Sequence, residues 1–190
     1  MMEVELKARV SDPEATRGRL ESFCRLDRDF DKRDAYWQGP RRLEDGDRRG
    51  FRLRTDGGDS FVTFKDKRLE GGIEVNCERE FTVSDQSAFV EFAWRLGCEP
   101  HFEKRKRGSR YEAVAGAASG TSVGLELAEI EGIGWFLEIE ALVPENDPGA
   151  VARAQGEIRS LLAQAGIGEE AIEPRFYSEL LMEAGRVARR

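Results

Sequence analysis

Charged side chains recur at every second position in several short segments of this 190-residue sequence. Near its start, Glu3, Glu5 and Lys7 alternate with the apolar residues Val4 and Leu6. Side chains two residues apart in a β-strand point to the same side, so this segment has one charged face and one apolar face. The charged face could contact solvent, as in many antiparallel sheets, or it could line a site inside the fold.

Further segments show the same alternation. The segment 102–107 is ambiguous, because Lys104 and Lys106 share one face, Arg105 and Arg107 share the other, and the spacing alone does not choose between them. If the charged faces meet, they bring together six cations and seven carboxylates. Two of the cations come from segment 102–107, and the other four are Lys7, Arg52, Arg54 and Lys65. The carboxylates are Glu3, Glu5, Glu78, Glu80, Glu126, Glu138 and Glu140.

Such a set of charges has a definite chemistry. Arg and Lys bind phosphate oxygens through charge-assisted hydrogen bonds, and clustered carboxylates bind hard cations such as Mg²⁺ or Mn²⁺. An interior with so many ions cannot be dry, because each unpaired buried ion costs several kcal/mol. We therefore expect a water-filled tunnel that binds a strongly anionic ligand together with a divalent metal.

The elements that must position these residues are short strands and amphipathic helices. Three segments each run from a Glu-x-Glu strand through an Asp-bearing turn into a helix, so this unit is repeated. The helices need apolar strand faces for docking, which turns the charged faces towards each other across a curled or closed sheet. We predict strands at 2–10, 33–38, 48–55, 60–66, 73–83, 101–107, 109–115, 121–130 and 135–143, and helices at 11–23, 84–97, 146–166 and 173–185.

Composition limits the remaining possibilities. The formal net charge of -7 and the pI of about 5.1 argue against non-specific binding to nucleic acid or anionic membranes. No apolar run approaches the roughly 18 to 20 residues of a membrane span, and the first strand leaves no room for a signal peptide. We therefore expect one cytoplasmic domain over residues 1–190, without a linker rich in Pro, Gly or Ser.

Histidine and cysteine exclude several kinds of site. His101 is the single histidine, which excludes multi-histidine metal centres and HExxH zinc sites. We interpret it as a surface residue at the start of a strand and give it no catalytic role. Cys24, Cys77 and Cys98 lie far apart in no CxxC spacing, so we expect small buried side chains and no disulfide framework.

Taken in order, the charged motifs resemble those of the CYTH family, the triphosphate tunnel metalloenzymes, which include class IV adenylyl cyclases and thiamine triphosphatases. The family's ExExK motif is similar to Glu3-Val-Glu5-Leu-Lys7, its RxR motif to Arg52-Leu-Arg54, and its TxK motif to Thr63-Phe-Lys65. Its ExE motif is similar to Glu78-Arg-Glu80, its KxR motif to Lys104-Arg-Lys106, and its closing GxG…ExE motif to Gly132-Ile-Gly134 with Glu138-Ile-Glu140. The segment "YSELL" resembles the family's C-terminal helix, and the resemblance runs from about residue 2 to 182. It implies an α+β fold: a closed, mainly antiparallel β-barrel of about eight strands that forms a charged tunnel, with helices packed outside.

The resemblance also implies a role for each charged residue. The expected triphosphate ligands are Lys7, Arg52, Arg54, Lys65, Lys104 and Lys106. The expected ligands of Mg²⁺ or Mn²⁺ are Glu3, Glu5, Glu78, Glu80, Glu138 and Glu140. The candidate catalytic residues are Lys7, Glu126 and Glu78.

Two positions depart from the family pattern. Ala128 stands where an acidic residue often lies two positions before Ile130, and Glu126, two residues earlier on the same face, matches an acidic position of some members. Asn76 stands where an arginine often precedes the Glu-x-Glu pair. Both departures bear on catalytic rate and substrate choice.

The leading functional hypothesis is a divalent-metal-dependent phosphohydrolase that acts on an inorganic or organic triphosphate, such as tripolyphosphate, ATP or thiamine triphosphate. The alternative is a class IV adenylyl cyclase, which would convert ATP to cyclic AMP and pyrophosphate with the same cations. A non-catalytic polyphosphate- or nucleotide-binding module is a third hypothesis, and a purely structural β-protein is a fourth. The sequence contains no nucleobase-reading motif, which favours the hydrolase, and we expect a monomer or homodimer without nucleic-acid or membrane partners.

Overall fold

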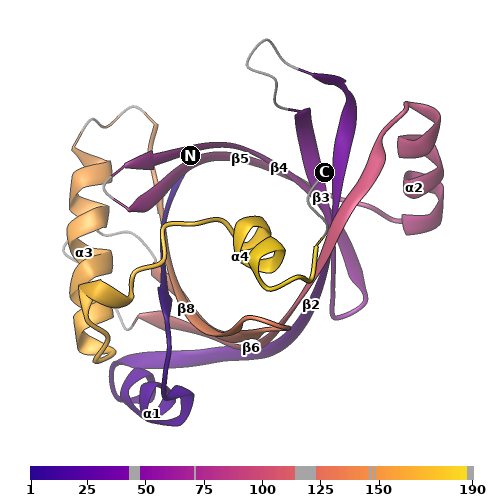
Figure 1. Cartoon of the computed structure of the whole chain (residues 1–190). Helices are drawn as coiled ribbons and strands as arrows, with labels where there is room; N and C mark the ends of the chain where they lie inside the picture. Colours follow the sequence, from indigo (N-terminus) through magenta and orange to yellow (C-terminus); the bar gives the residue numbers. More distant parts are fainter. Residues whose placement is uncertain (43–47, 71, 114–122, 146, 148, 188–190) are drawn as a thin grey trace.

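The computed structural model describes residues 1–42, 48–70, 72–113, 123–145, 147 and 149–187. In these residues eight strands form a closed barrel, in the order β1-β5-β4-β3-β2-β6-β7-β8, with every neighbouring pair antiparallel (Figure 1). The predicted fold class is therefore confirmed. The strands are β1 (Met2–Arg9), β2 (Cys24–Arg42), β3 (Arg48–Asp56), β4 (Asp59–Glu70), β5 (Ile73–Thr82), β6 (Glu99–Ala113), β7 (Val123–Ile130) and β8 (Gly134–Val143).

The helices follow the strands in the repeated order that the sequence predicts, because β1, β5 and β8 each lead into a helix. Asp12 and Asp85 precede the first two helices, and their carboxylates accept hydrogen bonds from the backbone N–H groups of Ala15 and Ala88 at 3.0 and 2.9 Å. Pro148, in the predicted start of the third helix, lies outside the described residues. The helices are α1 (Pro13–Phe23), α2 (Gln86–Arg95), α3 (Ala150–Gln164), the 3₁₀-helix η1 (Glu169–Ala171) and α4 (Tyr177–Glu183).

Strand β2 is much longer than the segment 33–38 that the sequence predicts. Its first half was missed because one face of residues 24–32 mixes apolar and charged side chains, so the period of two is weak there. This half matters for function, because it carries Lys32 to the interior of the barrel.

Strand β6 is continuous where the sequence predicts two strands separated by Gly108. This glycine marks a close approach of two strands and not a break in β6. A Cβ atom at this position would lie 2.1 Å from the carbonyl oxygen of Leu127 in β7, which only glycine avoids. Residues 114 and 115, the end of the second predicted strand, lie outside the described residues.

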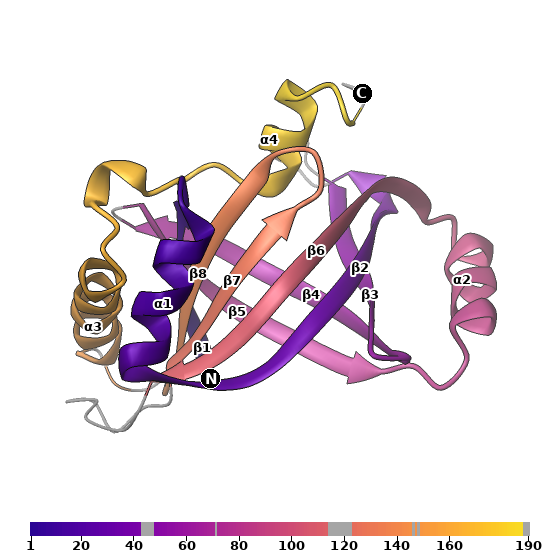
Figure 2. The ribbon, with the colours of Figure 1, turned by 90° about the horizontal axis from the view of Figure 1, so that it is seen from below.

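The main apolar core lies between the outer face of the barrel and the helices α1 and α3 (Figure 2). Val4 and Leu6 from β1, Ile139 from β8, and Leu20 and Ile158 from the two helices are fully buried in this cluster. Burying one such side chain contributes about 1.5 to 3 kcal/mol. Because the apolar faces of β1 and β8 are used in this way, their charged faces must point into the barrel.

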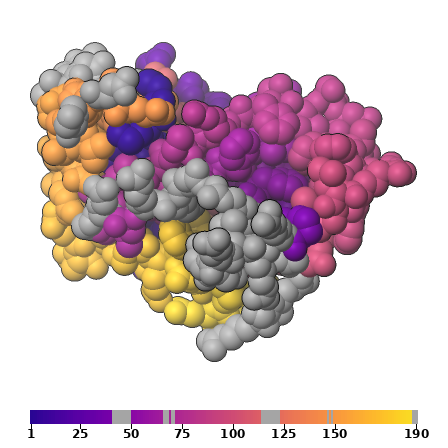
Figure 3. All heavy atoms as spheres, turned by 90° about the horizontal axis from the view of Figure 1, so that it is seen from above, coloured from indigo at the N-terminus to yellow at the C-terminus, as the bar shows by residue number. Residues whose placement is uncertain are grey.

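A second, smaller core holds α2 on the opposite side of the barrel. It contains Trp37, Leu53, Val62 and Ala93. In the space-filling view of Figure 3, α2 in pink and α3 in orange lie at opposite sides of the molecule, with the strands between them. None of the described helices is long and apolar enough to cross a membrane.

The three cysteines are free thiols. Cys24 is buried, as predicted, and burial raises its pKa to about 11, whereas Cys77 and Cys98 are half-buried.

Candidate active site in the barrel

The barrel contains a cavity of about 670 Å³ with a highly charged lining. The ambiguous segment 102–107 is resolved, since Lys104 and Lys106 face this cavity, while Arg105 and Arg107 pair with the outward-facing Asp31 and Glu129. All thirteen charged residues that the sequence singles out line the cavity: Glu3, Glu5, Lys7, Arg52, Arg54, Lys65, Glu78, Glu80, Lys104, Lys106, Glu126, Glu138 and Glu140. Their roles in binding and catalysis are still predictions at this point.

Cations and carboxylates of the cavity lie mainly on different strands. What we call the cationic wall is formed by β2, β3 and β6, with the side chains of Lys32, Arg52, Arg54, Lys104 and Lys106. What we call the acidic wall is formed by β1, β5 and β8, with Glu3, Glu5, Glu74, Glu78, Glu80, Glu138 and Glu140. Strands β4 and β7 separate the two walls and supply Lys65 and Glu126, while Lys7 is a cation within the acidic wall.

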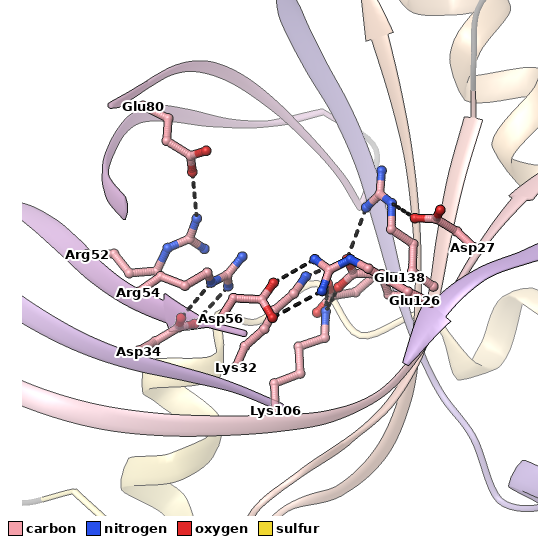
Figure 4. Close-up of polar contacts among 12 residues, drawn as sticks. Asp27, Lys32, Asp34, Arg52, Arg54, Asp56, Glu80, Lys106, Glu126 and Glu138 are labelled. Atoms are coloured by element: carbon pink, nitrogen blue, oxygen red, sulfur yellow. Dashed lines mark hydrogen bonds and ion pairs between the residues drawn. The ribbon is translucent and has the colours of Figure 1, made fainter. Parts of the chain in front are cut away.

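A buried carboxylate fixes two cations of the cationic wall. Asp34 of β2 is 2% exposed and accepts two hydrogen bonds from Arg54, at 2.7 and 2.9 Å (Figure 4). Its second oxygen also lies 3.2 Å from Nζ of Lys104. This two-point contact holds the planar guanidinium in one orientation, which a single ion pair would not do.

Arg52 is linked to the acidic wall through Thr63 of β4. Its guanidinium donates a hydrogen bond of 3.0 Å to the Thr63 hydroxyl, which in turn donates one of 2.8 Å to Glu80. Arg52 and Glu80 themselves lie 3.9 Å apart (Figure 4). The threonine of the TxK segment thus orients a cation and a carboxylate at once.

Glu126 of β7 contacts three cations. Lys32 and Lys106 each lie 2.6 Å from one of its carboxylate oxygens, and Arg110 donates to it at 3.0 Å. Lys106 also forms an ion pair with Glu138 (Figure 4). Glu126 and Lys106 therefore connect the cationic wall to the acidic wall on this side of the barrel.

In the acidic wall, carboxylates lie directly beside one another. Glu5 of β1 pairs in register with Glu140 on β8 and with Glu74 on β5. Two lysines contact the carboxylates of this wall. Lys7 lies 3.8 Å from Glu74, and Nζ of Lys65 lies 2.8 Å from both oxygens of Glu3, 2.5 Å from Glu78 and 3.9 Å from Glu5. One ammonium thus contacts three carboxylates.

Residues 1–177 match the CYTH domain. The chain belongs to the CYTH family. A relative from Methanocaldococcus jannaschii, named "Putative adenylate cyclase MJ0240", is 25% identical to this CYTH protein over 184 residues, which cover 95% of this chain and 98% of the relative.

Two solved structures from Pyrococcus resemble the whole CYTH chain. The PH1819 protein of Pyrococcus horikoshii OT3 has a TM-score of 0.77 and 26% identity, covering 95% of this chain and 98% of its own. A conserved hypothetical protein of Pyrococcus furiosus has a TM-score of 0.75 and 29% identity, covering 94% of this chain and 99% of its own.

In this CYTH domain the acidic wall carries more negative charge than its cations balance. Burial and the neighbouring Glu5 raise the pKa of Glu3 to about 10, although Lys65 opposes the shift. Burial and Glu5 likewise raise the pKa of Glu140. Both shifts have the same physical cause: carboxylates are held close together away from bulk water, where each disfavours ionisation of the other.

The carboxylates that contact the cations of the cationic wall behave in the opposite way. Burial alone would raise the pKa of Asp34, but Lys104 and Arg54 hold it well below its usual range. The pKa of Glu126 is likewise low, because Lys106 and Lys32 outweigh its burial. Burial lowers the pKa of Lys32 itself to about 8, even though Glu126 opposes that shift.

The donor chemistry of the acidic wall fits a hard divalent cation. Among the described residues, no three His, Cys, Asp or Glu side chains already stand in the arrangement of a metal site. Glu3, Glu5 and Glu140 nevertheless supply neighbouring carboxylate oxygens whose mutual repulsion, seen in the raised pKa of Glu3 and Glu140, a divalent cation would relieve.

The sequence interpretation missed five residues that line or support the cavity. Lys32 and Asp34 lie on β2 at the same parity as Tyr36. Asp34 lies inside the predicted strand 33–38, and extending that strand towards the N-terminus would have added Lys32. Arg110 and Glu74 share the parity of Lys106 and Glu78 on their strands and could have been found in the same way. Tyr177 is the fifth, and no strand pattern could have indicated it, because it enters the cavity from α4.

The interpretation of His101 as a surface residue is wrong. Its side chain is half-buried and lines the cavity, and its ring lies 5.1 Å from that of Phe102 at 79°. The alternation of β6 would place His101 outside with Arg105 and Arg107, but the register between β2 and β6 shifts here, because Tyr36 pairs with Phe102 and the next residue, Trp37, pairs with Pro100. The structure thus brings the single histidine to the cavity that the charged residues line.

The two departures from the family pattern have different surroundings. Ala128 is fully buried where β7 pairs with Gly108 of β6, while Glu126 lines the cavity on the same strand. Asn76 is 1% exposed, pairs in register with Glu3 and donates a hydrogen bond of 3.4 Å to Glu74. A neutral amide, and not a cation, therefore lies beside the acidic wall and supplies no positive charge to it.

Proposed function

We propose that this protein is a divalent-metal-dependent phosphohydrolase that binds the triphosphate group of its substrate inside the barrel. The observation that supports this proposal is the division of one cavity into a cationic wall and an acidic wall. The oxygens of a triphosphate need the cationic wall, and the metal ion that accompanies the triphosphate needs the acidic wall.

In this proposal the phosphate oxygens are bound by Lys7, Arg52, Arg54, Lys65, Lys104 and Lys106. Arg54 presents its guanidinium in the orientation that Asp34 fixes, so little side-chain entropy is lost when a phosphate binds. Lys32 adds a further positive charge to the set that the sequence predicts.

Mg²⁺ or Mn²⁺, held by Glu3, Glu5, Glu138 and Glu140 with Glu78 and Glu80 nearby, would neutralise phosphate charge and lower the pKa of a water molecule. Of the candidate catalytic residues, Lys7 would stabilise the negative charge that develops on the phosphate oxygens. Neighbouring lysines hold the pKa values of Glu126 and Glu78 low, because they outweigh the effect of burial. Both carboxylates are therefore better suited to positioning these lysines than to accepting a proton.

Adenylyl cyclase activity is the second candidate. The relative from Methanocaldococcus jannaschii carries that name, and the cavity also offers an aromatic surface. Tyr36 and Phe102 line it and stack on each other with ring centroids 4.2 Å apart at 8°. Aromatic rings of this kind can pack against a nucleobase, which the charged residues cannot do.

The decisive experiment identifies products. The purified protein is incubated with ATP, tripolyphosphate or thiamine triphosphate, with Mg²⁺ or Mn²⁺ present. A phosphohydrolase releases orthophosphate, a cyclase releases cyclic AMP and pyrophosphate from ATP, and a binding module raises its melting temperature with ligand but forms no product. Absence of both products and of any thermal shift would contradict the whole proposal.

A further inference from the structure

A second cavity, of about 430 Å³, lies outside the barrel beside α2, and we call it the apolar groove. Its volume falls within the roughly 300 to 1,000 Å³ of small-molecule sites. The walls of the apolar groove are mainly aromatic, with side chains from three strands and from α2 and the residue after it: Phe51, Phe64, Phe81, Phe89, Phe92 and Leu96.

The apolar groove leaves several large side chains in contact with solvent. Phe64, Phe81, Phe92 and Leu96 are between 47% and 56% exposed. A single exposed apolar residue is ordinary, but a group of them around one groove is typical of a surface that a ligand or a partner covers. The apolar groove is therefore a candidate binding site.

The barrel wall is open beside the apolar groove. Within the described residues, the pairing of β3 with β4 ends at Arg52 and Thr63. Beyond this pair β3 stays beside β2 as far as Arg48, whereas β4 stays beside β5 as far as Glu70. Figure 1 shows the end of β2 and the start of β3 extending together beyond the ring of strands. We call the separation of β3 from β4 at this place the wall opening.

The wall opening joins the apolar groove to the cavity inside the barrel. Gly50, Phe51, Phe64 and Lys65 line both. Phe51 and Phe64 each precede an inward-facing cation, Arg52 or Lys65, so the alternation of the strands directs both rings outward. They reach the inner cavity as well because no ladder between the described parts of β3 and β4 closes the wall at this point.

Two of the expected phosphate ligands stand at the inner side of the wall opening. Arg52 is the last residue of β3 that pairs with β4, and Lys65 lies two residues beyond its partner Thr63. Both side chains line the barrel cavity, and Lys65 also lines the apolar groove. A substituent on a phosphate group bound to Arg52 and Lys65 can therefore leave the barrel sideways and enter the apolar groove.

We propose that the apolar groove binds the hydrocarbon part of a triphosphate monoester whose phosphate chain lies in the barrel. The substrate class is an alkyl or isoprenoid triphosphate. Apart from Lys65, the described lining residues of the groove carry no charged or amide side chain, so the groove favours a hydrocarbon over a sugar or another polar group. This inference rests on the proposed function, because it places phosphate on Arg52 and Lys65.

The test compares three phosphate compounds on the whole protein. Tripolyphosphate and methyl triphosphate report binding in the barrel, whereas hexyl triphosphate adds a chain that can reach the apolar groove. Affinities are measured by displacement of bound tripolyphosphate, so that only binding in the barrel cavity is counted. Each buried methylene group tightens binding by up to about fourfold, so we expect hexyl triphosphate to bind at least about tenfold more tightly than methyl triphosphate.

Two variants test where the chain binds. Phe92→Gln places a polar amide on the wall of the apolar groove, and Phe64→Gln places one at the wall opening. Each should reduce the preference for hexyl over methyl triphosphate severalfold. Leu26→Gln is the matched control, because Leu26 is 48% exposed on β2 and lines neither cavity, and it should keep the wild-type preference. The comparison on the wild-type protein decides the inference even if a groove variant does not fold.

The possible failures are distinguishable. If neither tripolyphosphate nor methyl triphosphate binds, the proposed function is wrong and this inference is wrong with it. If both bind but hexyl triphosphate binds no more tightly, or if its advantage persists in both groove variants, the proposed function stands and the role of the apolar groove is wrong.

A second copy of the chain is the competing occupant of the apolar groove. It would cover Phe92 and abolish the advantage of hexyl triphosphate. Sedimentation would then show a dimer that Phe92→Gln dissociates, and this result would also overturn the inference.

Discussion

The cationic and acidic walls of the barrel face the same cavity, yet their buried charges are balanced differently. Asp34 in the cationic wall and Glu126 beside it lie between cations and have pKa values well below their usual range. In the acidic wall, burial and the neighbouring Glu5 raise the pKa values of Glu3 and Glu140, and Lys65, which is shared among several carboxylates, does not offset this. Glu78 and Glu138 of the same wall have lowered pKa values, because Lys65 and Lys106 outweigh their burial. The cationic wall is therefore balanced by carboxylates, whereas the group of Glu3, Glu5 and Glu140 lacks positive charge.

This difference indicates what each wall is prepared to bind. The cations of the first wall are held in position before any ligand arrives, which lowers the entropic cost of binding phosphate oxygens. The carboxylates of the second wall gain most from a ligand that brings positive charge, because such a ligand removes their mutual repulsion. We therefore expect changes in the acidic wall to affect metal-dependent steps and changes in the cationic wall to affect phosphate affinity.

The largest effect should come from removing one charge of the acidic wall. Glu5→Gln preserves the shape of the side chain but removes a carboxylate that lies between Glu140 and Glu74. We expect metal-dependent turnover to fall by about 100-fold or more, since metal ions supply several kcal/mol of charge stabilisation in such reactions. Steady-state turnover and Mn²⁺ affinity are measured side by side.

Glu91→Gln is the matched control for Glu5→Gln, because Glu91 pairs with Arg95 on the exposed face of α2. It should leave turnover and Mn²⁺ affinity unchanged. Full activity of Glu5→Gln at low Mg²⁺ would show that Glu5 is not a metal ligand and that the acidic wall does not have the proposed role.

A smaller effect is expected from the cationic wall. Arg54→Ala removes the guanidinium that Asp34 orients, and it should weaken tripolyphosphate binding by about 1 to 3 kcal/mol, the scale of a charged hydrogen bond. Calorimetric titration measures the affinity, and a thermal melt checks folding. Arg105→Ala is the control, because Arg105 lies on the outer face of the same wall and pairs with Asp31. Equal affinities of the two variants would contradict the assignment of phosphate binding to this wall.

The pH dependence of binding should reveal Lys32. Burial lowers the pKa of this lysine to about 8, so the free protein loses its proton as the pH rises through that value. A bound triphosphate favours the protonated form, so binding above this pH takes up a proton. Affinity should then fall by up to about tenfold per pH unit beyond the fall that is due to the ligand itself.

Two substitutions isolate this contribution. Lys32→Met should remove the extra slope and lower the affinity at pH 7, whereas Lys32→Arg should remove the slope and keep the affinity. Tripolyphosphate titrates identically in all three experiments, so differences between the variants belong to the protein. An unchanged slope in Lys32→Met would mean that Lys32 does not titrate on binding.

The smallest effect is expected at His101, although it lines the same cavity. If the enzyme is a hydrolase in which the metal lowers the pKa of water, activity should rise towards alkaline pH, and this limb should shift when Mn²⁺ replaces Mg²⁺. His101→Ala should leave the activity and the limb where they were. If His101→Ala removes the activity or the rising limb of the pH–rate profile, the histidine is catalytic and the proposed division of roles is wrong.

Several features of the site could be predicted from the sequence because they depend only on local geometry. Side chains in a strand alternate between two faces whatever the strand packs against. Once helices are assigned to the apolar faces, Glu3, Glu5 and Lys7 must share the opposite face, and the same holds for Arg52 and Arg54. The barrel interior could therefore be inferred strand by strand, and the resemblance to a known family assigned the inward face of 102–107.

Other features were decided by the tertiary structure alone. Lys32 was missed because the irregular half of β2 is held as a strand by its pairing with β6, and not by its own alternation. The role of Asp34 depends on its contacts with Arg54 and Lys104 from two other strands. His101 and Tyr177 reach the cavity because the register between β2 and β6 shifts beside His101 and because α4 lies across the mouth of the barrel. The residue types and their parity are properties of the chain, which the sequence contains in full. Which strands are neighbours, which charges balance each other and which helix closes the cavity depend on contacts between distant segments, and these exist only after the barrel has closed.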